Sequence, residues 1–275
     1  RSSTDKAMAL NTGFSVRGLT STDGKYPKQL AEKAHSPILY TIGLNPESEK
    51  ALTQKTIALV TGEKASGTAQ DLESIKAIAR DAAAKDWSVA IHLNGELATM
   101  AVKAITELPQ DNRPGLILIG DGHPAAYTSG GALDSVISTA KAGGVFLTAT
   151  APTPRPGTDA ELVKEGTFPM QPDRERAREL LGEIGTAMVI VKANGRDPSL
   201  LSMKRALELD VPVAAVSGAR DTSGKVQNID FVRPDYAANR RLLAGEAQFE
   251  VTKVTKKRAI QIPEGSAPRK SSTVR

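Results

Sequence analysis

The chain lacks cysteine and has few histidine and aromatic residues. Without cysteine it can form neither disulfide bonds nor thiolate metal sites. Its three histidines, His35, His92 and His123, are too few for a histidine-rich metal cluster. We expect neither a metal nor another cofactor. Aromatic residues make up 4% of the 275 positions, which argues against a recognition surface built mainly from aromatic stacking platforms.

Two further absences concern the location of the protein. No apolar run is long enough to span a membrane, and no secretory signal peptide is visible. We therefore expect a cytoplasmic protein without membrane contact. The contents of 40% hydrophobic and 24% charged residues are ordinary for a globular protein, and the length suits one large domain with or without appendages.

The formal net charge of +5 comes mainly from the end of the chain. Between residues 251 and 275, basic residues far outnumber the single acid, Glu264, and the preceding body is close to neutral. This segment is either a solvated, disordered end or a nonspecific phosphate-binding arm. A neutral body weakens the simple interpretation of a basic nucleic-acid-binding domain.

Short apolar runs alternate with amphipathic segments along the middle of the chain. This alternation predicts a doubly wound, mostly parallel α/β fold of Rossmann-like type. The predicted strands are 38–42, 56–60, 88–92, 116–119, 144–148, 188–191 and 213–216. The predicted helices are a short one between residues 26 and 44, then 69–85, 97–108, 131–141, 174–184 and one from about 199 to 207.

Three regions are expected from this pattern. Residues 1–36 form a lead-in whose first 25 residues lack periodicity and read as irregular, and residues 37–235 form the Rossmann-like domain. Residues 236–275 hold a terminal helix at 236–249 and the basic tail. A loop is expected at 152–156.

The segment from Ala187 to Gly218 predicts a parallel strand–helix–strand unit. In an open parallel sheet the carboxyl ends of the strands face the ligand. The loop after the first strand therefore places Lys192, Arg196 and a helix N-terminus where an anion would bind. The alternative for Lys192 is an ion pair with Glu63 or Asp121.

A second candidate loop follows the first core strand. Its sequence, TGEKASGTA from residue 61, is small and hydroxyl-rich and opens a helix, so its backbone N–H groups could face a phosphate. It is neither the dinucleotide-binding GxGxxG pattern nor a P-loop. The alternative is a tight turn in which a serine or threonine caps the helix.

Taken together, these segments resemble the DNA-processing protein A family (DprA/Smf). The resemblance covers about residues 26–232 and rests on the order and spacing of motifs that are each weak alone. The matching segments are Tyr26-Pro27, 37–43, 57–63, 117–122 with Tyr127, Phe168-Pro169 with 174–176, 199–206, 211–218 and Ser223-Gly224 with Asn228.

The chain also departs from the family pattern. Glu63 stands where the family has arginine, and Thr99 and Lys103 stand where it has an aspartate and a histidine. Lys192 replaces the acid usual after the valine-rich strand. The catalytic Pro-Gly-Gly loop of the cytokinin-activating cousins is absent, so hydrolysis of nucleoside phosphates loses support.

Five further residues are considered as candidates for the site. His92 is expected to be a satisfied, half-buried histidine rather than a catalytic one, and His123 is expected on the surface. Asp121 suits either a ribose contact or a turn. Arg174 and Arg178 share a helix face at spacing i, i+4, which suits phosphate binding or a solvated surface.

The resemblance implies a non-enzymatic protein that binds single-stranded DNA, protects incoming strands in natural transformation and recombination, and loads a RecA-type recombinase as a homodimer. The expected phosphate-binding residues are Thr61, Gly62, Lys64, Ser66, Gly67, Arg174, Arg176, Lys192, Arg196, Ser199 and Ser202. Two alternatives are a domain that binds a nucleotide or nucleotide-derived ligand in a mobile-element, defence or DNA-modification system, and a scaffold that has lost its ligand.

Overall fold

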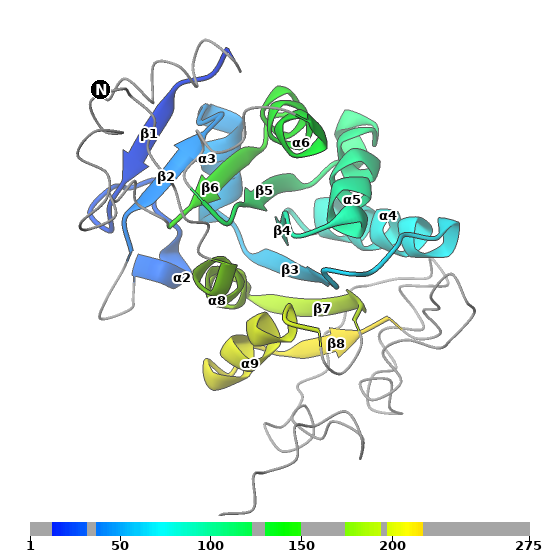
Figure 1. Ribbon diagram of the computed structural model, residues 1–275. Helices are drawn as coiled ribbons and strands as arrows, with labels where there is room; N and C mark the ends of the chain where they lie inside the picture. Colours follow the sequence, from blue (N-terminus) through cyan, green and yellow to red (C-terminus); the bar gives the residue numbers. More distant parts are fainter. Residues whose placement is uncertain (1–12, 32–36, 123–129, 150–173, 194–196, 217–275) are drawn as a thin grey trace, which may run out of the picture.

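The protein folds around one eight-stranded sheet. The computed structural model describes residues 13–31, 37–122, 130–149, 174–193 and 197–216, and Figure 1 shows the arrangement of their elements. The strand order is β1-β2-β6-β5-β4-β3-β7-β8. Strands β1 and β2 pair antiparallel, as do β2 and β6, and the remaining strands run parallel. The predicted mostly parallel α/β class is confirmed.

The strands are short, and most are buried along their whole length. Their bounds are β1 Val16–Leu19, β2 Leu39–Ile42, β3 Thr56–Thr61, β4 Ser88–His92, β5 Gly115–Ile119, β6 Val145–Thr148, β7 Ala187–Lys192 and β8 Val213–Ala215. The helices are α2 Lys28–Ala31, α3 Pro46–Thr53, α4 Ala69–Ala84, α5 Glu96–Thr106, α6 Gly130–Lys141, α8 Arg174–Ile184 and α9 Leu200–Glu208.

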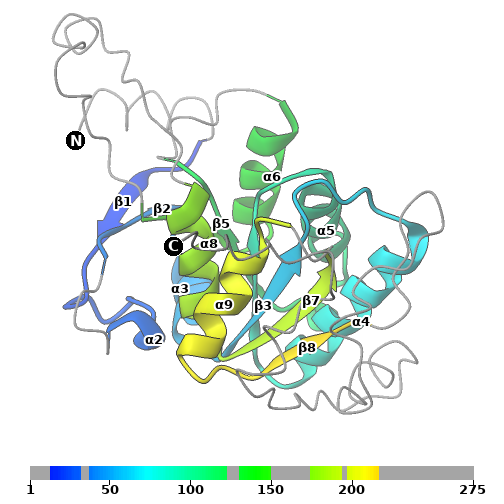
Figure 2. The same ribbon diagram turned by 60° about the horizontal axis from the view of Figure 1, so that its bottom comes forward.

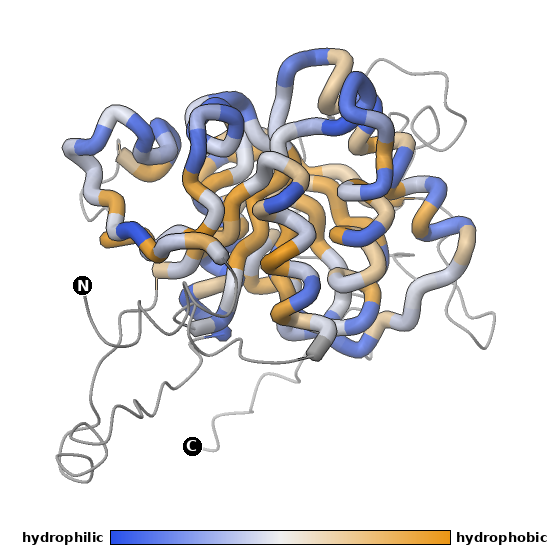
Figure 3. The backbone as a smooth tube through the Cα atoms, turned by 90° about the horizontal axis from the view of Figure 1, so that it is seen from above, coloured by the Kyte–Doolittle hydropathy of each residue, from blue (hydrophilic) through white to orange (hydrophobic). Residues whose placement is uncertain are grey.

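Helices cover both faces of the sheet, because each strand alternates its side chains between two cores. Ile57 and Leu59 of β3 pack with residues of α4, α5 and α6, whereas Ala58 and Val60 pack with residues of α8 and α9. Figure 2 shows α8 and α9 side by side on their face of the sheet. In Figure 3 the strands form an orange hydrophobic centre between more polar helices.

Several predicted elements coincide with the structure. Strand β4 and helix α8 have the expected bounds, and the others agree to within one or two residues. Residues 1–25 were expected to be irregular, and this is wrong at Val16–Leu19, which forms the edge strand β1. The sequence analysis also missed α3, which begins with a capping box between Asn45 and Ser48.

Some expectations concern segments outside the described residues. They are the loop at 152–156, the helix at 236–249, the basic tail, His123 and Arg196, and the motif matches at Tyr127, Phe168-Pro169, 217–218, Ser223-Gly224 and Asn228. The boundaries proposed at 36/37 and 235/236 stay predictions. Within the described residues, no helix combines the length and the apolar character needed to cross a bilayer.

The strand order marks one position in the sheet. From β3 the chain proceeds through β4, β5 and β6 in one direction, and then returns to add β7 and β8 on the other side of β3. The connections on the two sides of the β3–β7 pair therefore lie on opposite faces. Ligands of open α/β sheets bind beside such a switch point, at the carboxyl ends of the strands.

The burial of Tyr26 predicts that the folded state loses stability at alkaline pH. Its ring is buried, and its hydroxyl donates a 2.6 Å hydrogen bond to the carbonyl oxygen of Pro37. Burial raises the pKa of Tyr26 to about 12 from its ordinary value of 10. The folded state therefore favours the protonated phenol, and this contribution is complete below pH 10 and lost as the pH rises towards 12.

We expect the urea midpoint of the protein to fall between pH 10 and 12 more steeply than that of Tyr26→Phe. The phenylalanine variant should be less stable at pH 8 by about 1 kcal/mol, because it loses the hydrogen bond. Urea titrations of both proteins from pH 8 to 12 measure the difference, since lysine titration is common to both. Parallel pH profiles would show that Tyr26 does not cause this loss of stability.

Candidate functional site

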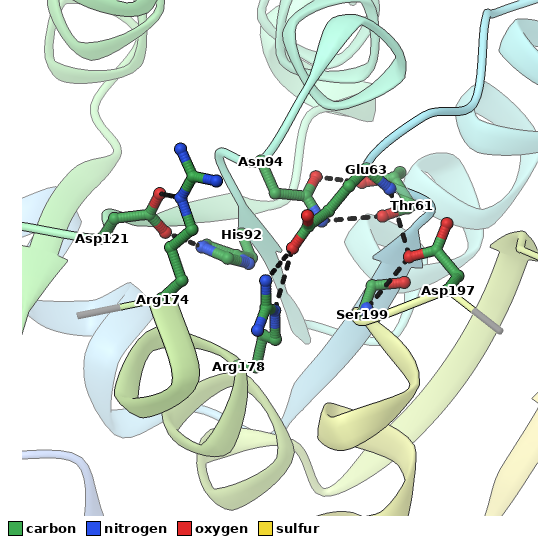
Figure 4. Close-up of polar contacts among 9 residues, drawn as sticks. All are labelled: Thr61, Glu63, His92, Asn94, Asp121, Arg174, Arg178, Asp197 and Ser199. Atoms are coloured by element: carbon green, nitrogen blue, oxygen red, sulfur yellow. Dashed lines mark hydrogen bonds and ion pairs between the residues drawn. The ribbon is translucent and has the colours of Figure 1, made fainter. Parts of the chain in front are cut away.

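Polar side chains gather at the carboxyl edge of the sheet, around the switch point. We call nine of them the edge cluster, and Figure 4 shows how they lie: they come from the ends of β3, β4, β5 and β7 and from the starts of α8 and α9. The members are Thr61, Glu63, His92, Asn94, Asp121, Arg174, Arg178, Asp197 and Ser199.

Lys192 does not belong to this cluster, although the sequence placed it opposite an anion. Its side chain is buried, and its ammonium donates hydrogen bonds of 2.8 Å to Asp71 Oδ2 and 2.9 Å to the carbonyl oxygen of Ser66. The predicted ion pair of Lys192 with Glu63 or Asp121 is wrong, because Asp71 in the first turn of α4 provides the carboxylate. Lys192 therefore connects the end of β7 with the β3–α4 loop and the first turn of α4.

The β3–α4 loop is shaped by packing. A Cβ at Gly62 would lie 2.6 Å from Asp197 Oδ2 and 3.0 Å from the carbonyl oxygen of Lys192, so only glycine fits. Gly67 lies as closely against Met100 of α5. Thr68 caps α4 through a capping box with Asp71, as the alternative interpretation of this loop predicted.

Two residues of the same loop differ in how much they can offer a ligand. Thr61 is buried, and Asn94 clamps it by donating 2.8 Å to its carbonyl oxygen and accepting 3.1 Å from its hydroxyl. Lys64 is exposed, so its charge is available to a ligand.

Glu63 is held at three points in the middle of the edge. Its backbone N–H donates to Asp197 Oδ1 at 3.3 Å, and its carbonyl oxygen packs so closely on Gly95 that a Cβ there would lie 2.6 Å away. Its side chain accepts two hydrogen bonds from Arg178 of α8. The residue therefore connects the loops after β4 and β7 with α8.

His92 and Asp121 form a pair at the ends of β4 and β5. His92 Nε2 donates to Asp121 Oδ1, and Arg174 Nε lies 3.4 Å from the other carboxylate oxygen of Asp121. The His92 side chain is 2% exposed, so it is fully rather than half buried. Its Nδ1 has no hydrogen-bond partner in the described structure, and in the neutral ring this atom is an unfilled acceptor.

The three arginines of α8 point to different places. Arg174 and Arg178 both reach the edge cluster, as their i, i+4 spacing predicts, and Arg174 is the more exposed of the two. Arg176 instead donates to Glu179 at 3.1 Å and Glu183 at 3.0 Å. Burial alone would lower the pKa of Arg176, but these two carboxylates outweigh it and raise the pKa, so Arg176 serves the packing of α8.

The start of α9 contains buried hydroxyl groups for which the described part of the chain provides no partner. Asp197 Oδ1 accepts a 2.9 Å hydrogen bond from the backbone N–H of Ser199, which fixes the turn into the helix. The Oγ atoms of Ser199 and Ser202 are buried, and neither has a hydrogen-bond partner within the described residues. Such groups are costly unless a water or ligand fills them. They therefore mark this end of the sheet as a candidate ligand site.

A surface groove also lies at the opposite, amino ends of the strands, lined in part by Lys50, Trp87 and Arg113. Two of the cations there already have partners: Lys50 Nζ pairs with Asp86 at 2.8 Å, and Arg113 donates to the carbonyl oxygen of Leu108. We place the site at the carboxyl edge, because ligands of open α/β sheets bind at the carboxyl ends of the strands beside the switch point.

Sequence reasoning missed Asn94, Asp71 and Asp197 as parts of this region. Asn94 and Asp197 each follow a predicted buried strand by a few residues, so the rule that carboxyl ends gather at one edge could have found them. Asp71 had a signal as well, since it stands three residues after the capping Thr68. No group of three or more potential metal ligands occurs among the described residues.

The fold and the edge cluster define a doubly wound, Rossmann-like protein with a polar site at its β3–β7 switch point. No protein-family model matches the sequence, and comparison with curated proteins detects no relative.

Solved structures of DNA processing protein A share this fold. The protein from Helicobacter pylori, described as having a unique single-stranded DNA binding mode, matches with a TM-score of 0.55 at 14% identity, over 86% of this chain and 92% of its own. The protein from Streptococcus pneumoniae matches with a TM-score of 0.52 at 16% identity, over 90% of this chain and 75% of its own. The DprA-like fold that the motifs implied is therefore confirmed.

Proposed function

We propose that the protein binds single-stranded DNA along the carboxyl edge of its sheet, without catalysing a reaction. The observation that carries this proposal is the gathering of hydrogen-bond donors at that edge: the exposed cation of Lys64, the largely exposed Arg174 beside Asp121, and the buried hydroxyls of Ser199 and Ser202, which have no partner within the described residues. The Helicobacter pylori protein of the same fold, which binds single-stranded DNA, supports it.

The proposed contacts are to phosphate, because the donors are cations, hydroxyls and the loop from Thr61 to Gly67 rather than stacking rings. Binding should therefore depend steeply on salt and only weakly on base sequence. A fluorescence anisotropy titration with oligo-dT at several salt concentrations tests the proposal. Absence of binding at low salt would reject it.

Two variants test where the DNA lies. Arg174→Gln and Lys64→Gln should each weaken binding of oligo-dT, and each should reduce the slope of log K against log salt by about 0.7, the value for one phosphate contact on a single strand. Lys103→Gln is the matched control, because Lys103 is 75% exposed in the last turn of α5, away from the edge cluster. If all three variants weaken binding equally, the effect is one of net charge and the edge is not the site.

The resemblance also supports a proposal about the wider role. We propose a cytoplasmic homodimer that protects incoming strands and loads a RecA-type recombinase during natural transformation and recombination. Light scattering tests the homodimer, and pull-down of a purified RecA-type recombinase in the presence of single-stranded DNA tests the partner.

A nucleotide-derived ligand is the second candidate, and the carboxylates of the edge cluster favour it. Glu63 and Asp121 already pair with Arg178 and Arg174, so the edge is balanced in charge rather than strongly basic. Carboxylates at this position can also bind ribose hydroxyls. A thermal shift on addition of nucleotides would support this candidate, since a ligand that binds only the folded state stabilises it.

A further inference from the structure

We propose that Arg178 forms a phosphate-binding subsite that the chain's own Glu63 occupies, so that Glu63 sets the affinity of the edge for phosphorylated ligands. This inference deepens the proposed function and rests on the same edge of the sheet. The sequence analysis gave Arg178 either phosphate binding or a solvated surface. The structure places it against Glu63 in the edge cluster, whereas Arg176 pairs with Glu183.

The position of Arg178 is that of a ligand-binding group. It projects from α8 into the middle of the edge cluster, between His92 and Ser199 in Figure 4. Its side chain is 10% exposed, so the pair is largely shielded from bulk water but remains accessible from the surface. Within the described residues its guanidinium donates to Glu63 and to no backbone carbonyl, so no helix end or turn depends on it.

The hydrogen bonding between the two side chains is incomplete. Arg178 Nε donates to Glu63 Oε1 at 2.9 Å, and Nη2 donates to the same oxygen. The favoured arrangement of arginine with a carboxylate or phosphate uses two parallel bonds to two different oxygens. A phosphate group can provide that arrangement, so it can compete with Glu63 for Arg178.

The carboxylate of Glu63 can be displaced without loss of its backbone position. Its N–H is held by Asp197 Oδ1, and its carbonyl oxygen is packed on Gly95. A bound phosphate would therefore move one side chain and leave the loop in place. The anion that the phosphate would replace is the protein's own Glu63 carboxylate. The subsite is therefore filled and electrically balanced when no ligand is bound.

Removing the charge of residue 63 tests this inference. In Glu63→Gln the amide keeps the shape of the side chain and frees Arg178. We expect oligo-dT to bind about tenfold tighter, as one charge-assisted hydrogen bond would contribute. The salt slope should steepen by about 0.7, which corresponds to one more phosphate contact.

A second probe separates this inference from the proposed function. Inorganic pyrophosphate should raise the melting temperature of Glu63→Gln more than that of the wild type, whether or not DNA binds. Tighter pyrophosphate binding with no DNA binding by either protein would reject single-stranded DNA as the ligand and keep the subsite. Equal affinities of the variant and the wild type in both titrations would overturn the subsite.

Two further proteins make the test specific. Glu175→Gln removes the same charge from an exposed position in the first turn of α8, so it should leave both affinities unchanged. Glu63→Gln/Arg178→Gln should lose the gain of the single variant. Glu63→Ala replaces the glutamine variant if the latter is unstable, and the same outcomes apply to it.

Discussion

Replacing Lys192 by methionine is expected to lower the free energy of unfolding by about 3–5 kcal/mol, the range for breaking a buried ion pair by removing one partner. Lys192 and Asp71 each have side chains that are 2% exposed. Without the ammonium, the Asp71 carboxylate would remain buried with the Thr68 cap as its support. The carbonyl oxygen of Ser66 would also lose its donor.

Urea unfolding at pH 7 measures this loss, with two controls. Lys76→Met removes a partly exposed lysine from α4 and should change stability by less than about 0.5 kcal/mol. Adding Asp71→Asn to Lys192→Met should recover part of the stability, because the uncompensated charge is then gone while a side chain that can cap α4 remains. A loss below about 1 kcal/mol in Lys192→Met would show that the pair matters little.

Gly182→Ala is expected to destabilise the protein by about 1–3 kcal/mol, the range for overpacking a close contact. A Cβ at this position in α8 would lie 2.4 Å from the carbonyl oxygen of Ser202 and 3.1 Å from the backbone nitrogen of Ala206, both in α9. Backbone atoms cannot rotate away, so the two helices would have to separate. In an unobstructed helix the same change would stabilise by up to about 1 kcal/mol, so the contact reverses the sign.

Gly131→Ala in α6 is the control, because the nearest atom to a Cβ there is 3.9 Å away. It should be neutral or slightly stabilising in the same urea titrations. Since α8 carries Arg174 and Arg178 and α9 begins beside Ser199, Gly182→Ala should also weaken binding of oligo-dT if the proposed function is right. A Gly182→Ala protein that is more stable than the wild type would show that the helices can separate at little cost.

Much of the fold was predictable, because its strands are buried on both faces and therefore appear as compact apolar runs. Strand β4 and helix α8 could be placed to the residue. Strand β1 escaped prediction since its central residues, Arg17 and Gly18, are exposed and only its ends are buried. This strand is defined by its pairing with β2, and such a pairing cannot be recognised from the local sequence of residues 16–19.

The position of the edge cluster was predictable, but its contacts were not. Strand ends pointed to the carboxyl edge, where these polar side chains do gather, yet the partner of Lys192 lies 121 residues away and that of Arg178 lies 115 residues away. Sequence spacing gives charges and helix faces, but not which carboxylate a cation meets across the sheet. Rules based on local sequence fail here, because tertiary packing determines which of several chemically similar carboxylates lies beside a given cation.

The placement of β3 between β4 and β7 has a consequence for synthesis. All six residues of β3 are buried, and one of its two hydrogen-bonding edges is covered by β7, which ends at Lys192. At about 5–20 residues per second, a growing chain leaves that edge bare for on the order of ten seconds after Thr61 is made. An open apolar strand edge is a template for pairing with other chains, so the ribosome-bound nascent protein is most exposed to aggregation during this interval.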